Sequence, residues 1–310
     1  MLKQGNCIKR ITAVTTQVLE ANAGESFLIK ALYCVPVTGN DYLVLKVDRK
    51  TVGVYRTKGK SGNHLGHIQG EYIHRNLMEF MTSKGINCSI PVAEGQSFAV
   101  SATGNTPVVV IVYDIYDAGD IRSDMPNGTT SKEYLFLQYM CSSETIDAVK
   151  TVTLDTSLSP AEFPDFPCGK SVPANATIDI LGLVGCPVGN GTGFAVRSAS
   201  QYVKMVKERE VLFDEARNGI PFFAEADFET GLVWMADFSL IGPCVPVTTI
   251  ASVGGGTNAG TLGDPLIFDP ALRFISGEEL LIYMSFIWIT AYDIAGTDID
   301  LAAIMKVTMT

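Results

Sequence analysis

Short apolar runs recur along the whole chain, and they constrain its fold more than any other sequence feature. Most runs are rich in Val, Ile, Phe and Tyr and are separated by Gly, Asn, Pro or Thr. This pattern is typical of many short β-strands joined by turns. Examples are residues 27–37, 42–47, 98–101, 108–116, 134–140, 177–184 and 279–292. We therefore predict an all-β fold in which the continuously apolar strands are buried on both faces.

Two segments have helical rather than strand spacing. In residues 71–83, four apolar side chains recur at helical intervals, and residues 198–217 form the second segment. Gly85 and Gly219 stand where C-terminal helix caps belong. We predict one short helix inserted among the strands of each half.

The length of 310 residues exceeds the usual size of one hydrophobic core, which predicts two domains, 1–155 and 156–310. Pro160, Pro164, Pro167 and Pro173 cannot continue a helix or an inner strand, so the segment that contains them is predicted to be a linker.

An internal repeat supports the division into halves. Ala21-Asn22-Ala23 resembles Ala174-Asn175-Ala176, and Gly95-Gln96-Ser97-Phe98 resembles Gly277-Glu278-Glu279-Leu280. Tyr113-Asp114-Ile115 likewise resembles Tyr292-Asp293-Ile294. We predict that the halves are unequal copies of one β-sandwich, in which Tyr113 matches Tyr292. A chance likeness between short apolar strands is the alternative.

Charge is sparse and acidic. Charged residues make up 18% of the chain, the formal net charge is −10 and the pI is about 4.8. This balance argues against sequence-specific nucleic-acid binding, which relies on attraction to phosphate, and favours burial of surface against further copies of the chain. The one basic stretch is interpreted as a solvated hairpin, with a patch for an acidic partner as the alternative: Lys46, Arg49, Lys50, Arg56, Lys58 and Lys60.

Seven scattered cysteines form no C-x-x-C pair, which indicates buried free thiols in a reducing compartment. The longest apolar run, residues 280–291, is shorter than the roughly 20 residues of a membrane-spanning helix. We predict no membrane span.

Motifs for catalysis or cofactors are incomplete. Residues 53–61 depart from the spacing of a phosphate-binding loop, and the glycine-rich residues 254–263 lack the strand and helix that a dinucleotide site needs, so we interpret them as a surface loop. His64, His67, Glu71 and His74 form the one cluster with metal-ligand character. We interpret it as a polar helix face, and zinc binding stays an open alternative. We predict no enzyme, no catalytic residue, no cofactor and no metal site.

In its length, internal repeat and inserted helices, the chain resembles the tandem jelly-roll capsid proteins of icosahedral viruses. This resemblance implies two jelly-roll-like β-sandwiches, a homotrimer that contacts other capsid proteins, and a place in a virion assembled in the host cytoplasm. Residues 112–120 and 125–128 resemble phage head-decoration and fibre proteins more weakly. A soluble lectin-like module that binds cell surfaces through residues 254–263 is the competing class.

Overall fold

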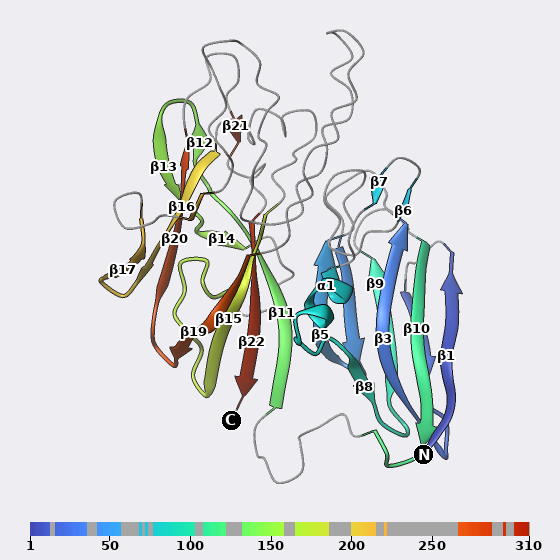
Figure 1. Ribbon diagram of the computed structural model, residues 1–310. Helices are drawn as coiled ribbons and strands as arrows, with labels where there is room; N and C mark the ends of the chain where they lie inside the picture. Colours follow the sequence, from blue (N-terminus) through green and yellow to red (C-terminus); the bar gives the residue numbers. More distant parts are fainter. Residues whose placement is uncertain are drawn as a thin grey trace, which may run out of the picture. The chain divides into compact units, whose positions relative to one another are not determined.

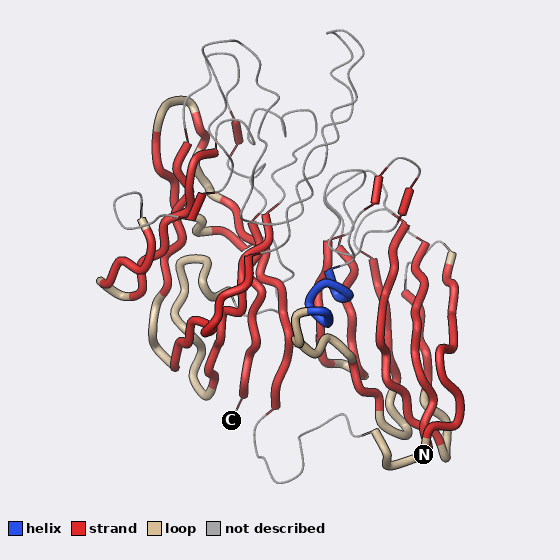
Figure 2. Tube along the Cα trace, viewed as in Figure 1, coloured by secondary structure: helices blue, strands red, loops and turns tan. Residues whose placement is uncertain are grey.

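The computed structural model is built almost entirely of β-strands, which confirms the all-β prediction (Figures 1 and 2). It describes residues 1–12, 16–35, 42–56, 68–69, 72–73, 77–102, 108–121, 132–157, 165–185, 200–214, 220–221, 266–286, 294–295 and 301–309. The chain divides into two compact units, unit 1 (residues 1–136) and unit 2 (Leu137–Met309). The sequence prediction placed the change of domain at 155–156, whereas β11 (Lys132–Cys141) already belongs to a sheet of unit 2.

Unit 1 is a sandwich of two antiparallel four-stranded sheets. The first sheet has the order β1 (Leu2–Ile11), β10 (Val108–Asp117), β3 (Glu25–Val35), β8 (Ile90–Val92). The second has the order β2 (Thr16–Glu20), β9 (Ser97–Ala102), β4 (Tyr42–Val47), β5 (Lys50–Arg56). Fully buried side chains from both sheets, such as Ile29, Leu45 and Phe98, fill the space between them. The small pair β6 (Ile68–Gln69) and β7 (Tyr72–Ile73) precedes α1 (Leu77–Ser83).

Unit 2 is a second sandwich of antiparallel sheets. One has the order β14 (Thr156–Ser157), β11, β22 (Leu301–Met309), β15 (Ala176–Gly185), β19 (Leu266–Ile275). The other has the order β13 (Lys150–Thr153), β20 (Leu280–Phe286), β16 (Ser200–Lys207), β17 (Glu210–Phe213), and β18 (Ile220–Pro221) also pairs with β16. A separate pair joins β12 (Thr145–Ile146) and β21 (Ile294–Ala295).

The two units share one strand order. With β6, β7, β12, β14, β18 and β21 set aside, each unit has eight strands, and their chain order gives the same neighbours in both sheets. Strand β1 then corresponds to β11, β3 to β15, β9 to β20 and β10 to β22. Each unit therefore repeats the topology of the other, apart from these small additions.

A β-bulge fixes the correspondence residue by residue. The pairing of β10 with β3 shifts between Val112 and Tyr113, and the pairing of β22 with β15 shifts between Ile304 and Met305. Because both shifts lie in corresponding strand pairs, Tyr113 corresponds to Met305. The predicted match of Tyr113 with Tyr292 is therefore wrong, and Tyr292 lies outside the described residues. Short apolar strands look alike in sequence, whereas a bulge marks one register.

The helix predicted at 198–217 is wrong, because this segment is the hairpin of β16 and β17. Val203 and Met205 are fully buried at a spacing of two, which is the period of a strand. The positive φ of Glu208, 53°, makes the turn between the strands.

The first predicted helix exists but begins at Leu77 rather than at 71. It ends as predicted at Gly85, whose φ is +81°. The backbone N–H of Ile86 donates to the Met81 carbonyl and that of Gly85 to the Thr82 carbonyl, which is a Schellman cap. No helix among the described residues is long and apolar enough to cross a membrane.

The described part of the predicted proline linker belongs to unit 2. Phe166 is fully buried and its ring contacts Phe274 with centroids 5.3 Å apart. Val172 is buried as well, and Ser171 forms a β-bridge with Glu279. Residues 165–173 therefore complete the second sandwich rather than connect the two. Pro160 and Pro164 lie outside the described residues.

Candidate functional site

The described residues of the two units share a specific arrangement of polar groups at two adjoining turns, which we call the duplicated corner. It contains Asp48 and Gly95 in unit 1 and Glu208 and Gly277 in unit 2. In unit 1, Asp48 occupies the turn between β4 and β5 with a φ of 54°. Its N–H donates to the carbonyl oxygen of Ser97 at 2.7 Å, and its Oδ1 accepts the N–H of Ser97 at 2.9 Å. This reciprocal pair ties the β4–β5 hairpin to the start of β9.

Unit 2 repeats this reciprocal pair. Glu208, with a φ of 53°, occupies the turn between β16 and β17. Its N–H donates to the carbonyl oxygen of Glu279 at 3.1 Å, and its Oε1 accepts the N–H of Glu279 at 2.7 Å. In each unit, an acidic residue in the left-handed conformation therefore forms the same reciprocal pair of hydrogen bonds.

The adjoining turn is duplicated too. In unit 1, Gly95 has a φ of 78°, and its N–H donates to the carbonyl oxygen of Ala21 at 3.0 Å. The N–H of Ala21 donates in turn to the carbonyl oxygen of Gln96 at 3.0 Å. The side-chain oxygen of Gln96 accepts the N–H of Ala93 at 3.0 Å. These bonds close the turn between β8 and β9.

The counterpart in unit 2 matches bond for bond. Gly277 has a φ of 86°, and its N–H donates to the carbonyl oxygen of Val172 at 3.0 Å. The N–H of Val172 donates to the carbonyl oxygen of Glu278 at 2.9 Å, and Glu278 Oε2 accepts the N–H of Ile275 at 2.8 Å. The similarity of Gly95-Gln96 to Gly277-Glu278 in sequence is confirmed as structural equivalence. Ala21, however, corresponds to Val172 and not to Ala174.

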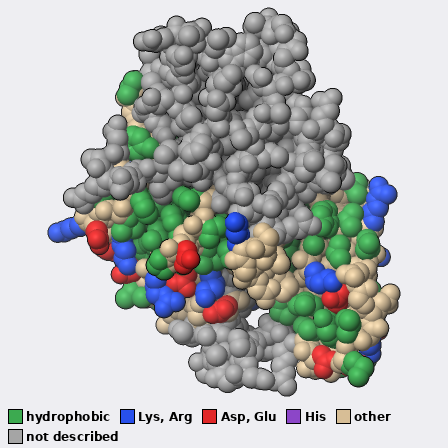
Figure 3. Space-filling view, viewed as in Figure 1, with side chains coloured by type: hydrophobic (Ala, Val, Ile, Leu, Met, Phe, Trp, Pro, Cys, Tyr) green, Lys and Arg blue, Asp and Glu red, His purple; other side chains and the backbone are tan. Residues whose placement is uncertain are grey.

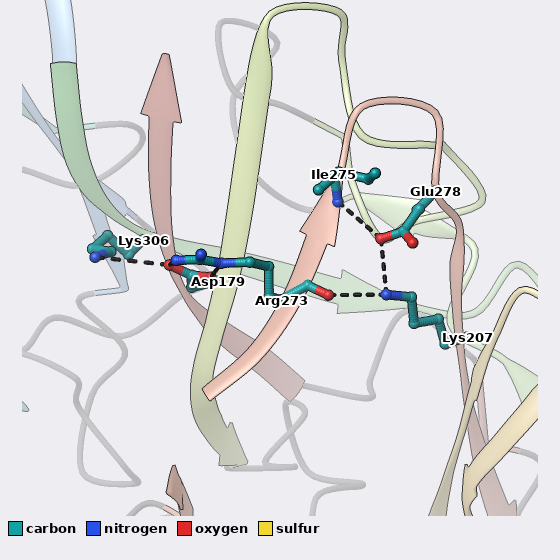
Figure 4. A network of polar contacts seen from close by, with 6 residues as sticks. All are labelled: Asp179, Lys207, Arg273, Ile275, Glu278 and Lys306. Atoms are coloured by element: carbon teal, nitrogen blue, oxygen red, sulfur yellow. Dashed lines mark hydrogen bonds and ion pairs between the residues drawn. The ribbon is translucent and has the colours of Figure 1, made fainter. Parts of the chain in front are cut away.

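Unit 2 adds a lysine to this corner (Figure 4). Lys207 Nζ lies 2.8 Å from Glu278 Oε2, donates to the carbonyl oxygen of Arg273 at 3.0 Å, and lies 4.8 Å from the centroid of the Phe274 ring. The hydrogen bond from Lys207, joined by that from the Ile275 N–H, lowers the pKa of Glu278. Because Lys207 lies on β16 and Arg273 on β19, this contact connects the two sheets of the sandwich.

In each unit, one sheet carries a nearly buried carboxylate on its outer face, which is the face directed away from the sandwich interior. These sheets are β1-β10-β3-β8 in unit 1 and β14-β11-β22-β15-β19 in unit 2. In unit 2 the carboxylate is Asp179, 5% exposed, on β15. Arg273 approaches it with two nitrogens, at 2.8 and 3.2 Å, and Lys306 Nζ lies 3.7 Å away on β22 (Figure 4). The hydrogen bonds from Arg273 lower the pKa of Asp179 although burial opposes them.

In unit 1 the nearly buried carboxylate on this sheet face is Asp114, 7% exposed, on β10. Burial raises its pKa, but the N–H of Asn6, which donates at 2.7 Å, and the Lys30 ammonium at 2.9 Å together lower it below its usual value. By the bulge register Asp114 corresponds to Lys306, so the two units place the acid and the base on exchanged strands. Both carboxylates are held ionised and act as ion-pair partners.

The described cysteines are free thiols, as the sequence predicts for its scattered set. Burial raises the pKa of Cys34, Cys88 and Cys168 to about 12 in each case, so these thiols stay protonated at neutral pH. They pack as small hydrophobic residues.

Most residues that the sequence singled out for chemistry lie outside the described residues: His64, His67, Glu71, His74, residues 59–61 and residues 254–263. Within the part of the chain that the structure describes, no three or more metal-ligating side chains come together. Lys46, Arg49 and Lys50 lie at the β4–β5 hairpin, as predicted.

The duplicated corner was missed because its acidic residues look like ordinary turn residues in the sequence. A signal was available, since Asp48-Arg49 and Glu208-Arg209 precede the matched Gly95 and Gly277 motifs in the same order.

Comparison with known proteins adds no identity: no protein-family model and no curated protein matches this chain.

Proposed function

We propose that this chain is a virion shell subunit made of two tandem jelly rolls. The observation that carries the proposal is the shared strand order. If the eight strands of either unit are lettered B to I along the chain, their sheets are B-I-D-G and C-H-E-F. This is the order expected when an antiparallel hairpin folds over twice into a jelly roll, an architecture common in viral capsid domains and lectins.

The surface of unit 1 supports assembly. On the outer face of the first sheet, Ile8 is 69% exposed and is aligned with Val112. Val110 and Val112 are partly exposed on β10, while Val109 and Ile111 point into the core. Figure 3 shows apolar side chains beside charged ones on the described part of the visible surface. Partly exposed apolar sheet faces favour association, and many weak contacts sum to a stable lattice.

The test is the assembly state of purified protein. Light scattering after size-exclusion chromatography should show trimers or larger species, and electron microscopy of particles should place the chain in the shell. A protein that remains monomeric at about 10 μM would contradict the proposal, because a subunit that binds its copies with micromolar or tighter affinity associates at that concentration. Density only at three-fold gaps over another shell protein would instead assign a decorating role. Selective glycan binding by a monomer would favour the lectin-like alternative.

A further inference from the structure

Strand β1 is an edge strand of unit 1 whose side chains are mostly exposed. In the described structure, β1 pairs with β10 along one side and is the outermost strand of its sheet (Figure 1). Over its ten residues, Ile11 alone is buried and Cys7 is partly exposed, while the other side chains are exposed. The pairing of β1 with β10 shifts twice between Leu2 and Cys7, so the regular edge of β1 is residues 7–11. In the described structure this edge offers unpaired backbone N–H and C=O groups to an incoming strand.

In unit 2, the edge of the corresponding strand is paired with a further strand. Strand β11 matches β1 in topology, and its far edge pairs with β14 through Met140 with Ser157 and Cys141 with Thr156. This added strand is antiparallel. The duplicated sandwich therefore accepts a two-residue strand at one end of the strand edge that β1 leaves unpaired among the described residues.

Charge on β1 restricts what can bind. The strand carries Lys3, Lys9 and Arg10 and no acidic residue. Lys3 is engaged by Asp117 and by the carbonyl oxygen of Gly24, whereas Lys9 and Arg10 have no ion-pair partner among the described residues. Two antiparallel β1 strands centred on Asn6 would set Lys3 against Lys9, which disfavours a symmetric contact between copies in that register.

The net charge differs between the two units. Residues 1–136 contain 14 Lys and Arg and 12 Asp and Glu, a net charge of +2. The whole chain carries −10, so residues 137–310 carry −12. An acidic segment is therefore not repelled by unit 1, although it is repelled by the chain as a whole.

We infer that the edge of β1 binds an extended acidic segment of a partner protein by β-strand addition. The register defines the pattern of that segment. Ile8 and Arg10 are aligned with the outward residues Val112 and Val110, and Lys9 is aligned with the inward residue Ile111. An antiparallel strand that presents two consecutive acids opposite Arg10 and Lys9, then an aliphatic residue opposite Ile8, satisfies all three positions. This inference does not rest on the shell role.

The experiment uses the full chain and synthetic ten-residue peptides. The probe alternates Thr and Val and contains one Glu-Glu-Val run, and fluorescence anisotropy should detect its binding. The double variant Lys9→Glu/Arg10→Glu should weaken binding at least fivefold and should bind a Lys-Lys-Val peptide instead. The matched double variant Lys170→Glu/Arg209→Glu carries the same charge change at exposed sites of unit 2 and should bind the acidic probe normally.

Two further results separate strand addition from charge attraction. The acidic peptide N-methylated at alternate residues keeps its charge but loses one row of hydrogen-bond donors, and one of the two possible patterns should lose binding at least tenfold. Equal binding of both patterns would overturn the inference, as would no binding of the unmodified probe. Self-association in sedimentation velocity that Lys9→Glu/Arg10→Glu abolishes would also overturn it, because the occupant would then be a second copy.

Discussion

At the residue scale, Asp179 illustrates how a carboxylate can be nearly buried and still ionised. Arg273 and Lys306 surround it, and both cations keep contact with solvent, with side chains 68% and 36% exposed. Burial of such an acid without partners would raise its pKa, so the lowered pKa shows that the bidentate contact with Arg273 outweighs desolvation. The same balance holds at Asp114 with Lys30 and the Asn6 N–H.

We expect Asp179→Asn to lower the free energy of unfolding by about 1–2 kcal/mol, because it removes charge-assisted hydrogen bonds but leaves both cations solvated. Guanidinium or urea unfolding measures this loss. Glu210→Gln, at an exposed position on β17, is the control and should change stability by less than about 0.5 kcal/mol. Equal effects of the two substitutions would show that the Asp179 ion pair contributes nothing measurable.

At the element scale, the pairing of β15 with β19 depends on a position that only glycine fits. Gly182 follows the bulge in β15, and a Cβ there would lie 2.1 Å from the Leu266 carbonyl oxygen of β19. By the bulge register the corresponding residue of unit 1 is Ala31. The close approach of β19 is therefore a feature of unit 2 alone.

Gly182→Ala should destabilise the protein by about 2–3 kcal/mol, because backbone must move to relieve the overlap. Gly5→Ala is the matched control on β1: its Cβ would lie 3.6 Å from Asp114 Oδ1, an ordinary contact, and it should stay within about 0.5 kcal/mol of the parent. Thermal or chemical unfolding measures both. A Gly182→Ala protein as stable as the control would show that β15 and β19 are not paired in this register.

The duplicated turns predict matched local effects. Gly95→Ala and Gly277→Ala place a Cβ in open space, so each should cost only the backbone penalty of a positive φ, about 1 kcal/mol. Hydrogen exchange should report each change locally. Gly95→Ala should reduce protection of the Ala21 amide, and Gly277→Ala that of the Val172 amide. Loss at the non-matching amide would contradict the equivalence of the turns.

At the scale of the whole molecule, acid should destabilise both units. The pKa values of Asp114, Asp155, Asp179 and Glu278 are lowered in the folded chain. A depressed folded pKa gives stability that is present above the unfolded pKa, about 4, and is lost as pH falls through the folded value. We therefore expect the free energy of unfolding to fall steeply below about pH 4.

A pH series of unfolding experiments checks this expectation. The free energy of unfolding of Asp179→Asn should fall less steeply as the pH is lowered. The variant lacks one carboxyl group whose pKa is lower in the folded chain than in the unfolded chain. A variant curve parallel to that of the parent would mean that Asp179 titrates alike in the folded and unfolded chain.

The β class, most strand positions and the existence of a repeat follow from the sequence alone. Apolar runs such as 42–47 and 108–116 became β4 and β10 because a strand needs only local side-chain chemistry to be recognised. The cap at Gly85 was readable for the same reason. Gly95 and Gly277 were matched correctly, since a positive φ selects glycine in both copies.

The register of the two copies and the partners of the charged side chains depend on tertiary contacts instead. Residues 198–217 have mixed polar and apolar spacing in the sequence. The pairing of Ser200–Lys207 with β20 and of Glu210–Phe213 with β16 makes these residues strands rather than a helix. Asp179 meets Arg273 across 94 residues, and Ser97 meets Asp48 across 49. Such contacts depend on which strands lie side by side, and strand pairing is a non-local choice that no single segment contains.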